Sequence, residues 1–171
     1  MQPFSKNIVF FDTEFTNLDI KVGELLSIGL IKYTGEELYL EIETNGGEVD
    51  PWVQKKVLPY LTQRKVTKKE AQNTIDDFIG DAKPYLMAYV NQFDAMYWYG
   101  LFEDPKDHPA FWIPIDFASL LFAYGYDPES MRQDKFLEQL GIDRTKYTQH
   151  NALEDAKLLA ETYKKFITQL L

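Results

Sequence analysis

The stretch that decides the fold is NIVFFDTEF, at residues 7–15. Its apolar run from Ile8 to Phe11 predicts a buried strand, and two carboxylates, Asp12 and Glu14, follow at the end of that run. Residues i and i+2 of a strand point to the same face, so we expect the two charges to lie side by side. Such a pair repels itself unless a cation lies between its members. The end of this strand is therefore a candidate metal site.

The next two segments predict an antiparallel meander with the first strand. LLSIGLIKY, at 25–33, has the apolar character of a buried strand, and ELYLEIET, at 37–44, alternates apolar and polar residues as a half-exposed strand does. Short polar links that contain glycine, such as YTGEE at 33–37, favour reversals of the chain. We therefore expect three consecutive antiparallel strands.

Two helix start signals follow the meander. Asp50 as a cap, with Pro51 at the first helical position, predicts a short helix. Thr67 and Glu70 have the spacing of a capping box and predict a longer one. We assign the stretch QRKVTKKE, at residues 63–70, to the exposed start of that second helix.

The second half of the chain alternates strands and helices. The expected elements are a strand in PYLMAYV (84–90), a helix from about Asn91, a strand in FWIPIDF (111–117), a helix capped by Asp116, a short helix over about 131–140 and a long helix after 151. This order predicts an α/β fold whose mixed sheet combines the three-strand antiparallel meander with two further strands and is flanked by helices. No linker divides the chain, so we expect residues 1–171 to form a single domain.

Composition limits the class of protein. A chain of 171 residues that is 45% hydrophobic and 15% aromatic can bury a core. The absence of cysteine excludes disulfides and thiolate metal sites and favours the reducing cytoplasm. We expect no secretory leader, because no basic-then-apolar segment opens the chain, and no membrane span, because no apolar run reaches about 18 residues. A net charge of −9, from 18 basic and 27 acidic residues, argues against a broad basic surface for a polyanion, although metal ions would supply local positive charge.

Further acids occur where strands turn into helices, which is where ligands bind in open α/β sheets. Asp94, in AYVNQFDAMYW, falls in the first turn of the helix after the fourth strand. Asp155, in HNALEDA, falls in the first turn of the last helix, where Asn151 and Glu154 have the spacing of a cap and its N3 partner. His150 precedes that cap, so we expect it on the loop, free to lean over the same site.

This set of side chains suits a particular chemistry. Oxygen ligands without cysteine, and without a cluster of histidines, favour Mg²⁺ or Mn²⁺ over zinc. Two such ions about 3.5–4 Å apart can activate a water and stabilise the leaving oxygen of a phosphoryl displacement. His150, the one imidazole near the carboxylates, fits the general base for that water.

Three stretches, FDTEFT (11–16), NQFD (91–94) and HNALEDA (150–156), resemble the motifs of the DnaQ-like, DEDDh branch of 3′-to-5′ exonucleases, which have an RNase H-like fold. The resemblance runs from about residue 7 to 166. It separates this chain from the branch that places a tyrosine four residues before the last aspartate, where Asn151 stands here. The roles that it implies are two Mg²⁺ or Mn²⁺ ions held by Asp12, Glu14, Asp94 and Asp155, with Glu14 also counted as catalytic and His150 as the base.

A narrower resemblance concerns the substrate. DPWVQKKVLPYL (50–61), AYVNQFDAMYWYGLF (88–102) and HPAFWIPIDFASL (108–120) are similar to the RNase AS-like exoribonucleases, which prefer RNA that contains adenylate. The similarity implies single-stranded RNA rather than DNA as partner, release of nucleoside 5′-monophosphates, and a homodimer. It also implies substrate contacts from Thr13, Phe15 and Leu18, two of them apolar enough to pack against terminal bases. We expect the tryptophans, among them Trp52, in the core or at subunit contacts.

Other functions compete with this one. A haloacid-dehalogenase-type phosphatase would use Asp12 as nucleophile, but it needs a second aspartate in place of Glu14 and an acidic pair after a strand, and the only Asp-Asp pair, Asp76 and Asp77, has a helical pattern. A DNA-directed exonuclease, an endonuclease and a non-catalytic nucleic-acid-binding module on the same fold also remain open. All five candidate residues are present, whereas a domain that has lost its chemistry typically lacks one or more ligands.

Overall fold

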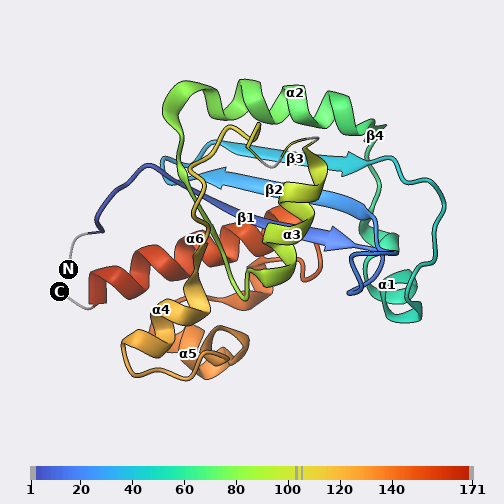
Figure 1. Ribbon diagram of the computed structural model, residues 1–171. Coiled ribbons are helices and arrows are strands. Elements are labelled where there is room, and N and C mark those ends of the chain that lie inside the picture. Colours follow the sequence, from blue (N-terminus) through green and yellow to red (C-terminus); the bar gives the residue numbers. More distant parts are fainter. Residues whose placement is uncertain (1–2, 103, 105, 170–171) are drawn as a thin grey trace.

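The computed structural model describes residues 3–102, 104 and 106–169, and in them a six-stranded sheet forms the centre of the molecule (Figure 1). The strand order is β4-β3-β2-β1-β5-β6. The strands are β1 (Ile8–Phe15), β2 (Leu25–Lys32), β3 (Glu37–Ile42), β4 (Lys65–Val66), β5 (Tyr85–Ala88) and β6 (Ile115–Asp116). The predicted α/β class, with a mixed sheet flanked by helices, is confirmed.

The directions of the strands confirm the meander. β1 pairs with β2 and β2 with β3 in antiparallel register, while β5 runs parallel to β1 and β6 parallel to β5. The sixth strand, β4, was not predicted, because residues 63–66 were assigned to a helix start; it pairs in parallel with the end of β3. Two residues are too few to display the alternation that identifies a strand in a sequence. β6 is shorter than expected, and Pro114, which has no N–H to donate to a sheet, directly precedes it.

The helices begin where their caps predicted. Asp50 accepts a hydrogen bond from the Trp52 N–H at the start of α1, and Thr67 and Glu70 form both halves of the capping box of α2. No helix among the described residues has the length and apolar character needed to cross a bilayer. The helices are α1 (Pro51–Lys56), α2 (Lys68–Ile79), α3 (Gln92–Leu101), α4 (Phe117–Ala123), α5 (Asp134–Gln139) and α6 (Ala152–Gln169), with short 3₁₀ turns at Leu58–Tyr60, Gly80–Ala82, Ser130–Arg132 and Arg144–Lys146.

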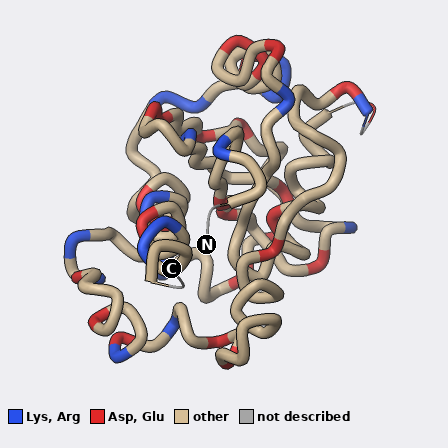
Figure 2. Tube along the Cα trace, turned by 90° about the vertical axis from the view of Figure 1, so that its left-hand side faces the viewer, with Lys and Arg blue, Asp and Glu red and all other residues tan. Residues whose placement is uncertain are grey.

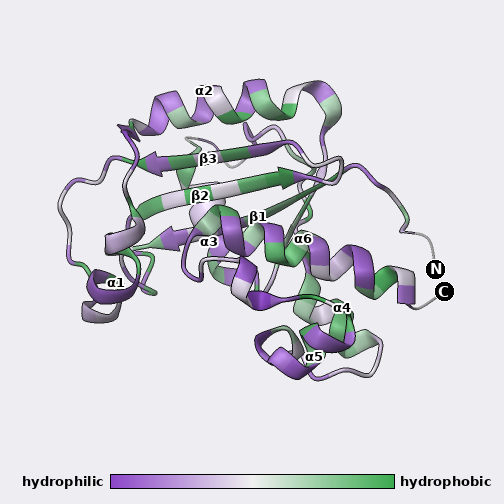
Figure 3. Ribbon diagram, turned by 180° about the vertical axis from the view of Figure 1, so that it is seen from behind, coloured by the Kyte–Doolittle hydropathy of each residue, from purple (hydrophilic) through white to green (hydrophobic). Residues whose placement is uncertain are grey.

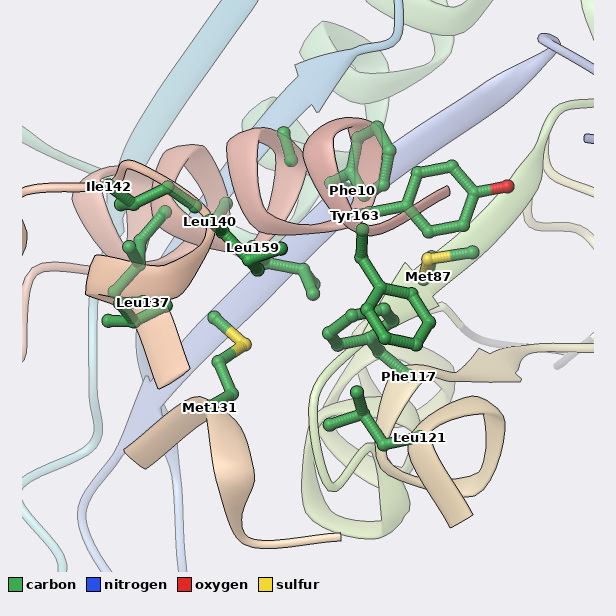
Figure 4. Packing of buried hydrophobic residues seen from close by; sticks show 14 of the residues in the cluster. Phe10, Met87, Phe117, Leu121, Met131, Leu137, Leu140, Ile142, Leu159 and Tyr163 are labelled. Atoms are coloured by element: carbon green, nitrogen blue, oxygen red, sulfur yellow. The ribbon is translucent and has the colours of Figure 1, made fainter. Parts of the chain in front are cut away.

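Helices cover both faces of the sheet. On one face, Phe11 of β1 packs with residues of α2 and α3 such as Ile75 and Trp98. On the other face, Phe10 packs with α4, α5 and α6, and Figure 4 shows this cluster around Tyr163. The central strands are therefore largely hydrophobic, while α2 mixes hydrophilic and hydrophobic residues along its length (Figure 3). The alternation of β1 sends Asp12 and Glu14 to the same face as Phe10, the face that α6 covers.

One close approach fixes the position of α6. A β-carbon built on Gly29 would lie 2.3 Å from the carbonyl carbon of Ala152 and 2.3 Å from the Leu153 nitrogen, so the first turn of α6 rests directly on the backbone of β2. Gly29 is also the cross-strand partner of Asp12. The contact therefore brings the start of α6 beside the end of β1, an arrangement that is visible near α1 in Figure 1.

Replacing Gly29 by Ala tests this contact. The added methyl group must push against backbone atoms, and we expect it to lower the free energy of unfolding by about 1–3 kcal/mol or more. Gly100→Ala is the matched control, because Gly100 lies in α3 with nothing within 4 Å of its ideal β-carbon. That variant should be neutral or about 0.5–1 kcal/mol more stable. Urea unfolding followed by circular dichroism measures both, and a Gly29→Ala variant as stable as the wild type would contradict the contact.

Candidate functional site

A cleft of about 600 Å³ lies at the carboxyl end of β1, between that strand, α1 and the start of α6. The side chains that line it come from segments far apart in the sequence. Every residue that the sequence analysis selected lines this cleft: Asp12, Thr13, Glu14, Phe15, Leu18, Asp94, His150 and Asp155. The structure therefore brings all eight together, while their chemical roles stay predictions.

Asp94 is held in place by the first strand. It is 7% exposed, and its Oδ1 accepts hydrogen bonds from the Thr13 N–H at 2.8 Å and from the Thr13 hydroxyl at 2.7 Å. Both donors of Thr13 point to this one oxygen, and Thr13 itself is 4% exposed. Thr13, which lies between Asp12 and Glu14 in β1, thus holds Asp94 near these two carboxylates.

The turn that leads into α3 is held by a fourth aspartate. Val90 has a φ of 59°, a region that β-branched residues rarely adopt, and it lines the cleft. Asp116 Oδ1 accepts from the Val90 N–H at 2.9 Å and from the Asn91 N–H at 3.3 Å. The same side chain caps α4, as the sequence predicted, through the Ser119 N–H at 3.0 Å. Asp116 therefore supports the turn that positions Asp94 and does not line the cleft.

The start of α6 positions Asp155 and His150. Asn151 Oδ1 accepts from the backbone N–H groups of the first turn at 3.2 Å, which confirms it as the cap. The Glu154 side chain contacts Lys157 at 3.0 Å. Asp155 Oδ2 accepts from the His150 N–H at 2.9 Å, and His150 has a φ of 61°. This backbone bend takes His150 off the helix axis and keeps it beside Asp155.

Three candidate ligands lie close enough to share a cation. Among the residues that the structure describes, one donor atom each from Glu14, His150 and Asp155 lies within 4.8 Å of the other two. Asp12 and Asp94 line the same cleft outside this triplet. The approach of His150 to two carboxylates makes it a candidate ligand as well as a candidate base.

Burial raises the pKa values of all four carboxylates, and the charges of neighbouring acids add to the rise for Asp12, Glu14 and Asp155. Burial raises the pKa of Glu14 to about 8, and the charges of Asp155 and Asp94 add to the shift. Burial also raises the pKa of Asp94 and that of Asp155 to about 6. The pKa of Asp12 lies well above its usual range, because of burial and then the charges of the other three acids. Ionising the whole group in this cleft is therefore unfavourable unless positive charge is added.

The donor set fits a hard divalent cation. Carboxylate oxygens are the preferred protein ligands of Mg²⁺ and Mn²⁺, and the chain has no cysteine that would favour a softer metal. A cation among Asp12, Glu14, Asp94 and Asp155 would reverse the repulsion that raises their pKa values. The site is therefore chemically suited to such ions.

His150 is packed against an aromatic ring that the sequence analysis assigned elsewhere. The indole of Trp52, on α1, meets the imidazole edge-on, with ring centroids 4.8 Å apart. Trp52 is 50% exposed and lines the cleft, so it is not a core residue; a subunit contact at Trp52 stays a prediction. Burial, and then the charge of Lys56, lowers the pKa of His150 below its usual range. The imidazole is therefore neutral, and able to accept a proton, near pH 7.

Aromatic side chains form the other wall of the cleft. Phe15 stacks on Tyr97 with centroids 4.4 Å apart, and Phe93 lies 6.1 Å from Phe15. The Tyr97 hydroxyl donates to the Asn17 carbonyl. Leu18 is 62% exposed at the rim. Phe93 was not predicted, because one apolar residue at a helix start has no distinctive pattern.

Comparisons with known proteins identify the fold. No family model and no curated protein matches the chain. Among solved structures, the complex of E. coli exonuclease I with single-stranded DNA in its zinc-bound form superposes with a TM-score of 0.70 at 16% identity over 95% of this chain. A 3′-exonuclease whose structure concerns recognition of the histone mRNA stem-loop gives 0.64 at 16% identity, covering 95% of this chain and 81% of that one. The RNase domain of the yeast Pop2 protein gives 0.58 at 12% identity, covering 96% and 77%.

These likenesses concern architecture. The chain spans 40% of the exonuclease I chain, so it corresponds to one part of that larger protein. The TM-scores of 0.70, 0.64 and 0.58 show that the backbone of this chain follows the same overall path as the backbones of these structures. The chain therefore has the RNase H-like fold that these exonuclease structures have.

Proposed function

We propose that this protein is a metal-dependent 3′-to-5′ exonuclease that removes nucleoside 5′-monophosphates from the end of single-stranded nucleic acid, RNA in preference to DNA. The observation that carries the proposal is the convergence of four carboxylates and one histidine, from three distant segments, in one cleft. The fold supports it, because two of the similar structures concern single-stranded DNA and a histone mRNA. The preference for RNA rests on the sequence resemblance.

Each side chain of the cleft has a role in this proposal. Asp12, Glu14, Asp94 and Asp155 hold two Mg²⁺ or Mn²⁺ ions. When bound, such ions supply positive charge against the phosphoryl oxygens and make a nearby water more acidic. A ring nitrogen of His150 takes the proton of the attacking water, and the edge of Trp52 limits how the imidazole turns.

The apolar wall receives the terminal base. Phe15 and Leu18 present hydrophobic surface beside the carboxylates, and stacking on such surface tolerates any base. Thr13, which was expected to contact the substrate, has both of its donors on Asp94, so we assign it to positioning that ligand. The proposed substrate contacts are then Phe15, at the end of β1, and Leu18, in the segment after it.

The arrangement does not favour the phosphatase alternative. Asp76 and Asp77 lie on the exposed face of α2 and line no part of the cleft. An acidic pair that completes a phosphatase site must approach Asp12. The acids that do approach Asp12 are Asp94, Asp155 and Glu14, the set that the exonuclease proposal uses.

A direct assay tests the proposed reaction. With Mg²⁺ or Mn²⁺ we expect single-stranded RNA labelled at its 3′ end to lose the label first, as a nucleoside 5′-monophosphate, faster than the matching DNA, and EDTA to abolish the activity. Asp12→Asn should be inactive, and Asp77→Asn, the same change on the exposed face of α2, should be fully active. Cleavage of a closed circle, loss of a 5′ label first, or undiminished activity in EDTA would contradict the proposal.

Thermal stability tests the metal site without any substrate. Carboxyl pKa values that are higher in the folded than in the unfolded protein mean that the folded state keeps protons that the unfolded state has lost, so stability falls as the pH rises. From the values near 6 and near 8, the melting temperature of metal-free protein should fall between about pH 5 and 8, and Mg²⁺ or Mn²⁺ should raise it again at pH 8.

The matched variants isolate the cleft. Glu14→Gln should raise the metal-free melting temperature at pH 8 by roughly 2–8 °C, because it removes one of the repelling charges. Glu138→Gln makes the same change on the exposed surface of α5 and should shift the metal-free melting temperature at pH 8 only slightly. A melting temperature that is independent of pH and of metal in the wild type would argue against a shared cation site.

The role of His150 has its own test. If His150 is the base, His150→Ala should lower kcat by about 10² to 10⁴ and leave metal affinity, measured by calorimetry, nearly unchanged. The acidic limb of the wild-type pH profile should lie below the ordinary imidazole pKa of about 6.5 and should disappear in the variant.

His108, the other histidine of the chain, provides the control. It is 8% exposed among aromatic rings and does not line the cleft. His108→Ala should lower stability and keep the shape of the pH profile. Loss of metal affinity in His150→Ala would instead identify His150 as a ligand.

A further inference from the structure

A second cavity, of about 420 Å³, continues from the cleft along the start of α6. The two cavities share part of their lining, including Asp12, Asp155 and His150, so they form one continuous groove across the carboxylates. Their ends differ in chemistry. Phe15, Leu18 and Phe93 line only the first cavity, whereas Met131, Arg144 and Gln149 line only the second.

The second cavity contains two arginines, and one of them is already engaged. Arg144 Nη2 donates to the Met131 carbonyl at 2.6 Å, and its Nε lies 2.8 Å from Asp134, with the side chain 21% exposed. These contacts hold the segments between α4 and α6 together, and the charge of Arg144 opposes part of the rise that burial causes in the pKa of Asp155. Arg144 therefore serves the structure of this wall.

Arg132 has a different environment. Its ion pair with Glu129 is long, at 3.8 Å, and both side chains are more than 60% exposed, so the pair is weak. Arg132 lines both cavities, which places it at their junction, beside the carboxylates. Basic and acidic positions are interspersed along the chain (Figure 2), so a cation at this junction is not part of a broad basic surface.

Tyr89 supports the position of Arg132. The guanidinium lies over the Tyr89 ring, 5.9 Å from its centroid, and the Tyr89 hydroxyl donates to the Pro128 carbonyl at 2.7 Å. Tyr89 follows β5 directly and also lines both cavities. Glu129 and the Tyr89 hydroxyl engage part of the guanidinium of Arg132, and its remaining N–H donors lie on a side chain that is 61% exposed, which suits recognition of a phosphate.

We propose that Arg132, supported by Tyr89, binds the phosphate of the nucleic-acid strand next to the one that is hydrolysed. The inference rests on the proposed function. A strand that crosses the carboxylates has one end at the apolar wall, which suits a base, and the other at Arg132. When an exonuclease acts on a 3′ end, only the terminal nucleotide lies on the 3′ side of the scissile phosphate. All the other phosphates of the strand lie on its 5′ side. The terminal base then occupies the Phe15 side, and the rest of the strand leaves past Arg132.

Substrates that differ in their number of phosphates test the proposal. A single-stranded RNA oligonucleotide has a phosphate beyond the scissile one, whereas the 4-nitrophenyl ester of thymidine 5′-monophosphate has only one. For Arg132→Ala we expect kcat/KM on the oligonucleotide to fall about tenfold to a hundredfold, mainly through KM, and at least ten times more than on the ester. The slope of log KM against log salt concentration should decrease by about one.

Two further variants sharpen the result. Arg132→Lys keeps the charge without the planar donors and should recover part of the loss on the oligonucleotide. Arg64→Ala is the matched control, because Arg64 is also an exposed arginine paired to a glutamate, Glu70 at 3.3 Å, and it lines neither cavity. It should behave as the wild type on both substrates, and melting curves show whether each variant is folded.

The outcomes separate this inference from the proposed function. A wild type that cleaves neither substrate overturns the nuclease proposal and this inference together. An active wild type whose Arg132→Ala variant loses activity equally on both substrates, or on neither, overturns the Arg132 assignment alone. A loss confined to the oligonucleotide in Arg132→Ala, and absent in Arg64→Ala, supports it.

Discussion

Repulsion among four carboxylates is the constraint on which the rest of this structure depends. Burial raises the pKa values of Asp12, Glu14, Asp94 and Asp155, and repulsion from neighbouring acids adds to the rise for all of them except Asp94, so placing these charges in the cleft without a cation is unfavourable. Packing on both faces of the sheet must offset that unfavourable term. Two of the non-glycine residues with positive φ, Val90 and His150, also line the cleft. Local strain and like charge are thus concentrated in one place, as is common where a binding site is built into a stable scaffold.

Close packing of backbone against backbone makes that concentration possible. Because Gly29 has no side chain, the first turn of α6 reaches the sheet beside Asp12, and Asp155 arrives with it. The third segment is tied in by hydrogen bonds, from Thr13 to Asp94 and from the turn before α3 to Asp116. Each attachment uses groups on the rigid sheet or at a helix start. The relative positions of the carboxylates therefore depend on the core and not on flexible loops.

The sequence predicts what is locally encoded. Caps such as Asp50, Thr67 and Asp116 fix helix starts because their signals span a few residues, and the apolar run before Asp12 identifies the first strand. Strand β4 was not predicted, because a strand of two residues is too short to show an alternating pattern. The sequence analysis did not place Trp52 and Arg132 at the cleft for another reason. Their position beside His150 and Asp155 arises only when α1 and the turn before α5 fold against the end of β1. Convergence of that kind leaves no pattern in a local stretch of sequence.

The charge of the protein has a consequence for how a strand would be held. A nuclease with a basic groove binds nucleic acid without metal, because many lysines and arginines release counterions from the phosphates. This chain has a net charge of −9, and the arginines that line its groove are Arg132 and Arg144, the second of which is bonded to its own fold. In the proposed function, most of the attraction for phosphate would then come from cations bound by the carboxylates. Substrate binding and catalysis would therefore depend on the same ions: without them the acidic cleft would repel nucleic acid, and with them it would become a binding site.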